Sequence, residues 1–162
     1  MNLPKRKQVR LKDYDYSQNN AYFITICTNN RTHLFGEIAN DTVGAHLCVR
    51  PNNPDKMIEK WLFELENKYP GITIDYYAIM PDHIHFILFC LAHAGAPLPE
   101  IIKWYKTQTT NAYIKGVKTG LYPPFDKHIW QRNYYEHIIR NEQDLYEIRK
   151  YIDENSLKWN LR

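Results

Sequence analysis

Hydrophobic and polar positions along the chain predict strands and helices that follow one another. Residues 21–29 (AYFITICTN) alternate and are rich in β-forming side chains, which predicts a first strand. Residues 54–69 carry apolar positions at helical spacing, and Pro70-Gly71 follows as an end signal. Residues 72–80 and 83–90 are again typical of strands. They are too close in sequence for a helical crossover, so we expect an antiparallel hairpin.

The second half of the chain predicts two more helices with one strand between them. Pro99 fits the first turn of a helix that runs to about residue 115, and residues 128–139 suggest a fourth strand. Asn141 and Asp144 resemble a capping box at the start of a last helix. The predicted class is α+β: an antiparallel sheet of four to five strands covered by helices, mainly on one face, as in ferredoxin-like and RRM-like sandwiches.

Length and composition agree with one globular domain. The 162 residues suit a single core, so we expect residues 1–162 to form one domain. No apolar run is long enough to span a bilayer, and we expect no membrane partner. The three cysteines are scattered, which favours a reducing cytoplasm and excludes both a disulfide framework and a cysteine zinc site.

The net charge of +3 excludes a polycation, but the basic residues are unevenly placed. Residues 1–15 form a basic N-terminal arm, whose cations include Lys5, Arg6, Lys7 and Arg10. Such an arm commonly contacts the phosphates of a nucleic acid. A solvated tail is the other interpretation, and the arm alone does not decide between them.

Two histidines stand in the otherwise apolar segment IMPDHIHFILF, which covers residues 79–89. On a strand, His83 and His85 point to the same face. They either bind a ligand together or fill a core as hydrogen-bonded side chains. No third histidine follows four residues on, as a histidine-triad hydrolase would need, and no HExxH pattern is present, which argues against a zinc protease. Two imidazoles without thiolates would leave open positions on a catalytic ion.

The last predicted helix places Tyr151 and Asn155 one turn apart. They flank an apolar stripe formed by Leu145, Ile148, Ile152 and Trp159. A tyrosine hydroxyl becomes a nucleophile when it is activated, and an amide oxygen is a suitable ligand for a hard divalent ion. The alternative is that Tyr151 packs at the edge of the helix interface.

These segments together resemble a known family. MPDHIHFIL resembles the histidine–hydrophobe–histidine (HUH) motif of the single-tyrosine transposases. WQRNYYEHIIRNEQDLYEIRKYIDENSLKW resembles the C-terminal block of the REP-associated tyrosine transposases, and RLKDYDYSQNNAYFITICTNNRTHLFGEI is similar to the start of the same branch. One position departs: the family usually has Asn-Pro where this chain has Asn155-Ser156. Without the proline, we expect the helix to continue toward Trp159.

The resemblance implies cleavage and strand transfer of single-stranded DNA through a 5′-phosphotyrosine intermediate. Tyr151 would be the nucleophile, carried by the C-terminal helix. His83, His85 and Asn155 would hold Mg²⁺ or Mn²⁺, and Asp82 would orient a histidine. The DNA partner would be a palindromic or hairpin sequence. Relatives act as homodimers or monomers, so a homodimer is open, and we expect a cytoplasmic, nucleoid-associated protein.

Four further cations could follow a phosphate backbone: Lys103, Lys106, Arg132 and Arg140. Each could equally be a solvated surface charge. Trp130, Tyr134 and Tyr135 could stack on bases, although core packing is favoured for at least two of them. Two other functions stay open: a catalytically idle protein that binds hairpin DNA, and an RNA-binding module with aromatic side chains on an exposed sheet face.

Overall fold

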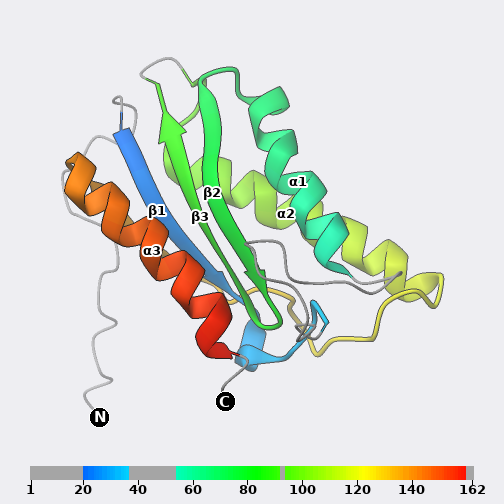
Figure 1. The fold of residues 1–162 in the computed structure, drawn as a ribbon. Coiled ribbons are helices and arrows are strands. Elements are labelled where there is room, and N and C mark those ends of the chain that lie inside the picture. Colours follow the sequence, from blue (N-terminus) through cyan, green and yellow to red (C-terminus); the bar gives the residue numbers. More distant parts are fainter. Residues whose placement is uncertain (1–19, 37–53, 92–93, 160–162) are drawn as a thin grey trace, which may run out of the picture.

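The computed structural model describes residues 20–36, 54–91 and 94–159. Its centre is a four-stranded antiparallel sheet in the order β2-β3-β1-β4 (Figure 1). The strands are β1 (Asn20–Cys27), β2 (Ile72–Met80), β3 (His83–Cys90) and β4 (Tyr135–Ile139). The expected β2–β3 hairpin is present, and the expected α+β class with an antiparallel sheet is confirmed.

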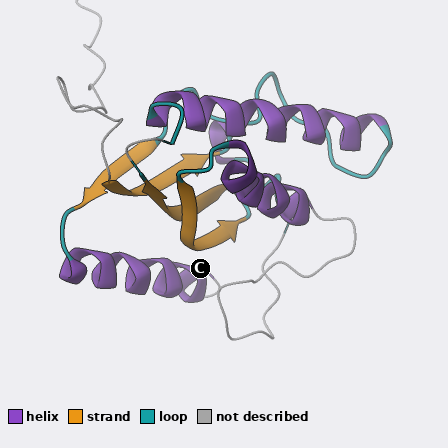
Figure 2. Ribbon diagram, turned by 90° about the horizontal axis from the view of Figure 1, so that it is seen from above, coloured by secondary structure: helices purple, strands orange, loops and turns teal. Residues whose placement is uncertain are grey.

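Helices cover both faces of this sheet. α1 (Pro54–Lys68) and α2 (Leu98–Lys118) pack on one face, and α3 (Glu142–Trp159) lies alone on the other (Figure 2). A short 3₁₀ turn, η1 (Asn29–Arg31), follows β1. The sequence favoured helices mainly on one face, whereas α3 forms a separate third layer. Among the described residues, no helix is both long and apolar enough to cross a lipid bilayer.

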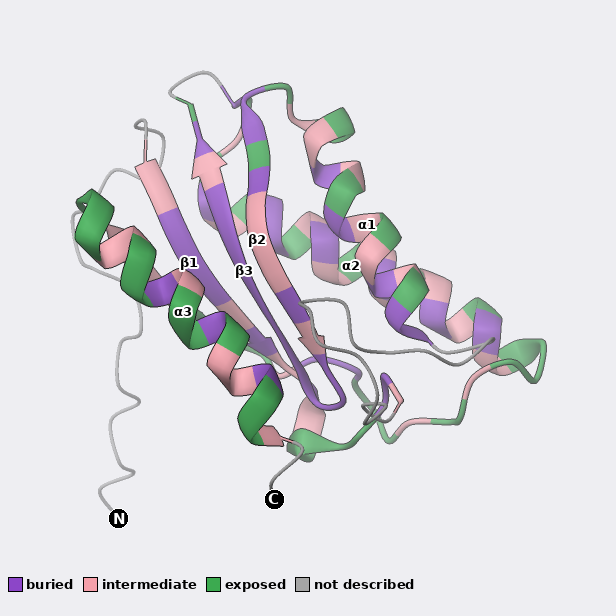
Figure 3. Cartoon of the chain, viewed as in Figure 1, coloured by how far each residue is buried: buried purple, intermediate pink, exposed green. Residues whose placement is uncertain are grey.

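Alternation along the strands divides the apolar side chains between two cores. Tyr22, Ile24 and Ile26 of β1 point toward α1 and α2, where the larger core lies. Phe23 belongs to a smaller cluster with Ala78, Ile87, Ile148 and Ile152, which holds α3. β3 is buried along almost its whole length, while the outer surface of α3 is exposed (Figure 3). The second face of the sheet is therefore only partly apolar, which leaves room there for polar side chains.

The fourth strand is shorter than the sequence predicted. Residues 128–139 were expected to be extended, but β4 begins only at Tyr135. Before it, the chain makes a single bridge between Trp130 and Thr28. Trp130 is buried, and its indole N–H donates to Thr109 Oγ1 at 2.9 Å. Packing against α2 therefore holds this segment in place of the regular hydrogen bonds between paired strands. The sequence also suggests a short strand near residues 46–49, but this segment and the basic arm lie outside the described residues.

Asn141 caps the N-terminus of α3, as the sequence predicted. Its Oδ1 accepts a hydrogen bond from the Asp144 backbone N–H at 2.8 Å. At the other end, α3 continues through Ser156 to Trp159, which confirms the expected effect of losing the proline. Ser156 itself is buried, and its hydroxyl donates to the Ile152 carbonyl at 3.4 Å.

Candidate active site

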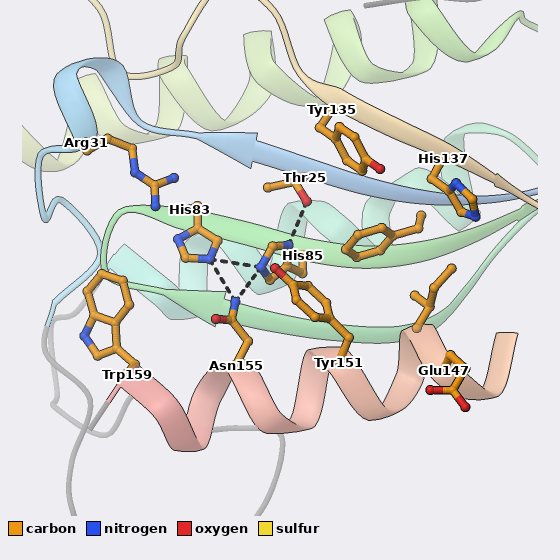
Figure 4. A pocket seen from close by; sticks show the side chains of 12 residues that line it. Thr25, Arg31, His83, His85, Tyr135, His137, Glu147, Tyr151, Asn155 and Trp159 are labelled. Carbon is orange, nitrogen blue, oxygen red and sulfur yellow. Dashed lines mark hydrogen bonds between the residues drawn. The ribbon is translucent and has the colours of Figure 1, made fainter. Parts of the chain in front are cut away.

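His83 and His85 lie side by side on the face of β3 that α3 covers. Register places His85 opposite Thr25, and His83 opposite Cys27, on β1. Both imidazoles are buried, and their Nε2 atoms are 3.0 Å apart. Two ring nitrogens at this distance point to one small volume between the sheet and α3 (Figure 4).

Each imidazole has a polar partner at its other nitrogen. His83 Nδ1 lies 2.5 Å from Asp82 Oδ1, and His85 Nδ1 lies 2.7 Å from Thr25 Oγ1. If Nδ1 carries the proton in each neutral ring, both Nε2 lone pairs face the shared volume. Burial, together with the neighbouring His83, lowers the pKa of His85 to about 3, so its ring stays neutral near pH 7.

Asp82 connects the histidine pair to the cation Arg31. Its Oδ2 lies 2.9 Å from Arg31 Nε, while its Oδ1 contacts His83. Burial alone would raise the pKa of the Asp82 carboxyl, but the hydrogen bond and electrostatic interaction with His83, together with the charge of Arg31, lower it below its ordinary value. Asp82 is therefore a carboxylate near neutral pH and can fix the ring orientation of His83.

Asn155 of α3 approaches both histidines. Its Nδ2 is 2.6 Å from His85 Nε2 and 3.3 Å from His83 Nε2, so the amide N–H groups can donate to both lone pairs. Rotating the amide by 180° about Cβ–Cγ exchanges Nδ2 for Oδ1, the atom that a cation requires. The two histidines and the amide thus converge on one point.

The three converging atoms suit a divalent ion. Two donors that bind one ion at about 2.1 Å and a right angle lie about 3.0 Å apart. The observed separations of 3.0, 2.6 and 3.3 Å are close to one triangular face of an octahedron. Among the described residues, no group of three His, Cys, Asp or Glu side chains could hold a metal. Of the described side chains, the Asn155 amide approaches both histidines and could serve as the third donor, and three protein donors would leave open positions on the ion.

Tyr151 lies next to this donor set and comes from the same chain. Its ring centroid is 5.5 Å from that of His85 and 5.9 Å from that of Phe23, with edge-on geometry in both cases. The side chain is 50% exposed, and its hydroxyl is on the side of the histidine pair (Figure 4). A tyrosine hydroxyl placed in this way is accessible to a polymer that enters from solvent.

An open pocket of about 630 Å³ surrounds these residues. Its lining includes Phe23, Thr25, Arg31, Tyr135, His137 and Trp159 in addition to the histidines, Tyr151 and Asn155. Trp159 was expected in the buried stripe of the last helix. Instead its ring lies 5.9 Å from that of His83 and 5.4 Å from that of His33, because the extended helix carries it past the core.

The family model for IS200-like transposases matches residues 16–155. This chain belongs to the IS200-like transposase family. The matched segment includes the histidine pair, Tyr151 and Asn155, which are the residues that the pocket brings together.

Two relatives align with this chain over most of its length. An uncharacterized protein of Haemophilus influenzae is 31% identical over 167 residues, which cover 95% of this chain and 89% of that protein. A provisionally named REP-associated tyrosine transposase of the same organism is 28% identical over 153 residues, with coverage of 89% and 74%. Both alignments extend well beyond the motif positions.

Solved structures share the fold of this transposase family member. A REP-associated tyrosine transposase bound to a REP hairpin gives a TM-score of 0.62 at 21% identity and covers 92% of this chain and 73% of that one. A provisionally named transposase from Deinococcus radiodurans gives a TM-score of 0.53 at 16% identity, with coverage of 91% and 96%. At these identities the likeness concerns the fold.

Of the cations expected to contact DNA, the four that the structure describes do not line the pocket. Lys103 and Lys106 lie on α2, on the opposite side of the sheet from α3. Lys106 Nζ donates to the carbonyls of Gln131 and Arg132 at 2.8 and 3.2 Å, so it also supports the loop before β4. Arg132 is exposed in that loop, and Arg140 is exposed after the far end of β4. Lys5, Arg6, Lys7 and Arg10 lie outside the described residues.

Of the three aromatic side chains considered for base stacking, two are buried, as expected, and one is exposed. Trp130 and Tyr134 are buried, whereas Tyr135 is 52% exposed and lines the pocket. The RNA-binding interpretation required an open sheet face with aromatic side chains, but α3 covers that face. This removes the structural basis for an RRM-like mode of binding.

Sequence reasoning missed Thr25 and Arg31. Thr25 could have been found from the alternation of β1 once its pairing with β3 was known, because it shares a face with Phe23. Arg31 depends on a turn conformation that no periodicity reveals.

Proposed function

We propose that this chain is a transposase that cleaves single-stranded DNA and transfers the strand through a covalent link to Tyr151, with Mg²⁺ or Mn²⁺ as cofactor. The observation that supports this best is the convergence of His83, His85 and Asn155 on one point, with Tyr151 beside it in the same pocket. A nucleophile next to a three-donor face is an arrangement that suits metal-assisted phosphoryl transfer.

In the proposed reaction, Tyr151 Oη attacks the phosphorus of the scissile phosphodiester. The Oη–P bond forms as the P–O3′ bond breaks, and the electron pair of the broken bond goes to O3′. The phenol proton leaves to solvent, and O3′ takes a proton from water. When bound, the divalent ion draws charge from a phosphate oxygen. One phosphodiester is exchanged for another, so attack by a 3′-hydroxyl reverses the step and joins strands.

The buried partners of the histidines have distinct tasks in this proposal. Asp82 and Thr25 hold the Nδ1 protons, so that both Nε2 atoms remain available as donors. Asn155 supplies Oδ1 after its amide rotates. Since Tyr151, His83, His85 and Asn155 belong to one chain, the proposed site needs no residue from a partner, whether or not the protein forms a homodimer.

We infer that the substrate is DNA that folds into a hairpin with a single-stranded flank. Support comes from the family and from the solved relative, which is bound to a REP hairpin. The runner-up is a catalytically idle protein that binds the same DNA. Ser156, the departure from the family pattern, does not favour it, because Asn155 still reaches both histidines.

The test is a cleavage assay on DNA hairpins that carry the sequence flanking the gene, with Mg²⁺, with Mn²⁺ and with chelator. Products are resolved on a denaturing protein gel. We expect a metal-dependent band of protein joined to DNA, which Tyr151→Phe abolishes while hairpin binding stays nearly intact. Tyr146→Phe is the matched control: this tyrosine is on the same helix, 60% exposed and outside the pocket lining.

Two outcomes would contradict the proposal. Hairpin binding without a covalent band under any ion would support the idle binding protein. A covalent band that survives in Tyr151→Phe but disappears in Tyr146→Phe would show that the nucleophile is misassigned. Hairpins with a scrambled stem test the substrate, because equal binding to both sequences would exclude recognition of a specific hairpin.

A further inference from the structure

Arg31 lies at the rim of the pocket on a turn with an unusual backbone. Asn30 and Arg31 have φ angles of 53° and 56°, in the left-handed region that residues other than glycine seldom occupy. Two consecutive residues in this region persist only where surrounding contacts hold them, and such positions often cluster at functional sites. Figure 4 shows the Arg31 side chain directed into the pocket near His83.

Backbone hydrogen bonds hold this turn against the histidine strand. The Thr28 N–H donates to the Asp82 carbonyl at 2.9 Å, and the Phe35 N–H donates to the Pro81 carbonyl at 3.1 Å. The Asn29 N–H donates to the Ile129 carbonyl at 2.7 Å. The turn is thus fixed at both ends to the β2–β3 connection and in its middle to the loop before β4. Arg31 is therefore preorganised relative to His83.

The guanidinium of Arg31 uses only part of its donor capacity inside the protein. Nε contacts Asp82 Oδ2 at 2.9 Å, and Nη1 donates to Cys27 Sγ at 2.7 Å. No described residue accepts a hydrogen bond from Nη2, and the side chain remains 47% exposed. A guanidinium offers five N–H donors, so several remain for a ligand.

The charges around the pocket favour an anion at the Arg31 end. Arg31 is the sole Lys or Arg among the described residues that line the pocket. Glu147, the acidic residue in the pocket lining, lies at the end of the pocket away from Arg31, one turn of α3 before Tyr151 (Figure 4). Asp82 already interacts with both Arg31 and His83, so it does not fully satisfy the guanidinium.

We propose that Arg31 is a catalytic residue that binds a non-bridging oxygen of the scissile phosphate from the side opposite Tyr151. This inference rests on the proposed function. Arg31 donates hydrogen bonds to the phosphate and stabilises the negative charge that grows on its oxygens as Tyr151 attacks. Asp82 holds the guanidinium in place and keeps it aligned with the histidine donors.

The competing interpretation is structural: Arg31 serves only to neutralise buried Asp82. The two interpretations differ in what they predict for DNA. If Arg31 contacts a phosphate, its contribution to DNA affinity depends on the charge of one particular phosphodiester linkage. A structural role would change the stability of the protein, or its affinity for every DNA, without regard to that linkage.

The experiment measures binding in the presence of chelator, in a Tyr151→Phe background, so that it needs neither metal nor cleavage. The probe is the flanking-sequence hairpin with its single-stranded tail, in which a neutral methylphosphonate replaces one phosphate at a time. The proteins are the Tyr151→Phe parent and the same protein with Arg31→Gln or Arg31→Gly. Glycine suits the left-handed turn, so Arg31→Gly removes the guanidinium while preserving the backbone.

We expect the parent to lose about tenfold in affinity at one linkage when its charge is removed. Both Arg31 variants should bind the unmodified DNA about tenfold more weakly and be insensitive to the methylphosphonate at that linkage. Arg132→Gln is the matched control: its guanidinium is outside the pocket lining, so the sensitivity to that linkage should remain. In the protein with Tyr151, Arg31→Gly should also slow covalent product formation by roughly 100-fold at saturating DNA.

The inference is overturned if the Arg31 variants keep the parent's sensitivity at every linkage, or if they bind unmodified DNA as the parent does. It is also overturned if both variants lose affinity equally for all probes. Failure of the proposed function looks different, because it appears as no covalent band with intact Tyr151 and leaves the linkage scan interpretable.

Discussion

At the scale of single residues, the site depends on the groups behind the histidines. Asp82 and Thr25 each occupy one Nδ1, which directs both Nε2 atoms to the same point. The MPDHIHFIL motif correctly indicated two histidines on one face, and the adjacent Asp82 could be read from the sequence. Thr25 could not, because it is brought to His85 by β1–β3 pairing, which single-sequence periodicity does not specify.

Thr25→Val tests this orientation. Valine has a similar shape but offers no oxygen to His85 Nδ1, so the ring can rotate or change tautomer. We expect a 10- to 100-fold loss in Mn²⁺ affinity, of the order found when such supporting partners are removed. Isothermal titration calorimetry measures the affinity directly. Thr25→Ser retains the hydroxyl and should bind the ion nearly as the original protein does; equal losses in both variants would show that β-branching, not the hydroxyl, is what matters.

At the scale of elements, α3 is held to the sheet by a small apolar cluster and by polar contacts on β2. Arg149 forms a two-point ion pair with Asp75, with Nη2–Oδ1 at 2.6 Å and Nε–Oδ2 at 2.9 Å. The Tyr76 hydroxyl donates to Asp153 at 2.6 Å. A bulge between Ile74 and Tyr76 directs the neighbours Asp75 and Tyr76 toward the same helix.

Removing the ion pair should loosen α3 more than it unfolds the protein. We expect Arg149→Ala to lower the free energy of unfolding by about 1 kcal/mol, since the pair is partly exposed but bidentate. Urea denaturation measures this loss, and hydrogen exchange should show faster opening of the α3 amides. Lys150→Ala on the same helix removes a looser contact, 3.8 Å from Glu154, and should cost less. Equal protection of α3 in both variants would contradict this account of its docking.

Sequence patterns located α3 and its cap correctly, but not its side of the sheet. Its apolar stripe indicated a buried face without saying which surface receives it. The bulge, which inserts one residue into β2, interrupts the alternation that would have shown Tyr76 facing α3. The extension through Ser156 was predicted, yet its result was not: Trp159 lies over His83 at the pocket instead of in the core.

At the scale of the whole molecule, proposed DNA contacts lie on two sides of one sheet. The pocket is under α3, whereas Lys103 is exposed on α2 and Arg132 is exposed in the loop before β4. A DNA that reaches both regions must therefore extend around the outside of the sheet. The sequence placed Lys103 on a helix and Arg132 beside the fourth strand, and could not show that both lie away from the histidines.

The salt dependence of hairpin binding tests whether these two cations contact DNA. We expect Lys103→Ala and Arg132→Ala each to weaken hairpin binding and to reduce the slope of log K against log salt by about 0.7 to 0.9. Lys60→Ala on α1 is the control, because this lysine lies over Trp61 and has no expected DNA contact. Fluorescence anisotropy at several salt concentrations gives the slopes, and three identical slopes would remove these two cations from the DNA interface.

Translation produces the parts of this site in a fixed order. Thr25 leaves the ribosome first, His83 and His85 follow on β3, and Tyr151 and Asn155 arrive last on α3. A nascent chain that has completed the sheet therefore has neither the proposed nucleophile nor the proposed third donor. On the proposed chemistry, a product that stops before Tyr151 cannot join itself to DNA. Premature termination before α3 would thus produce a protein that lacks the proposed cleavage chemistry.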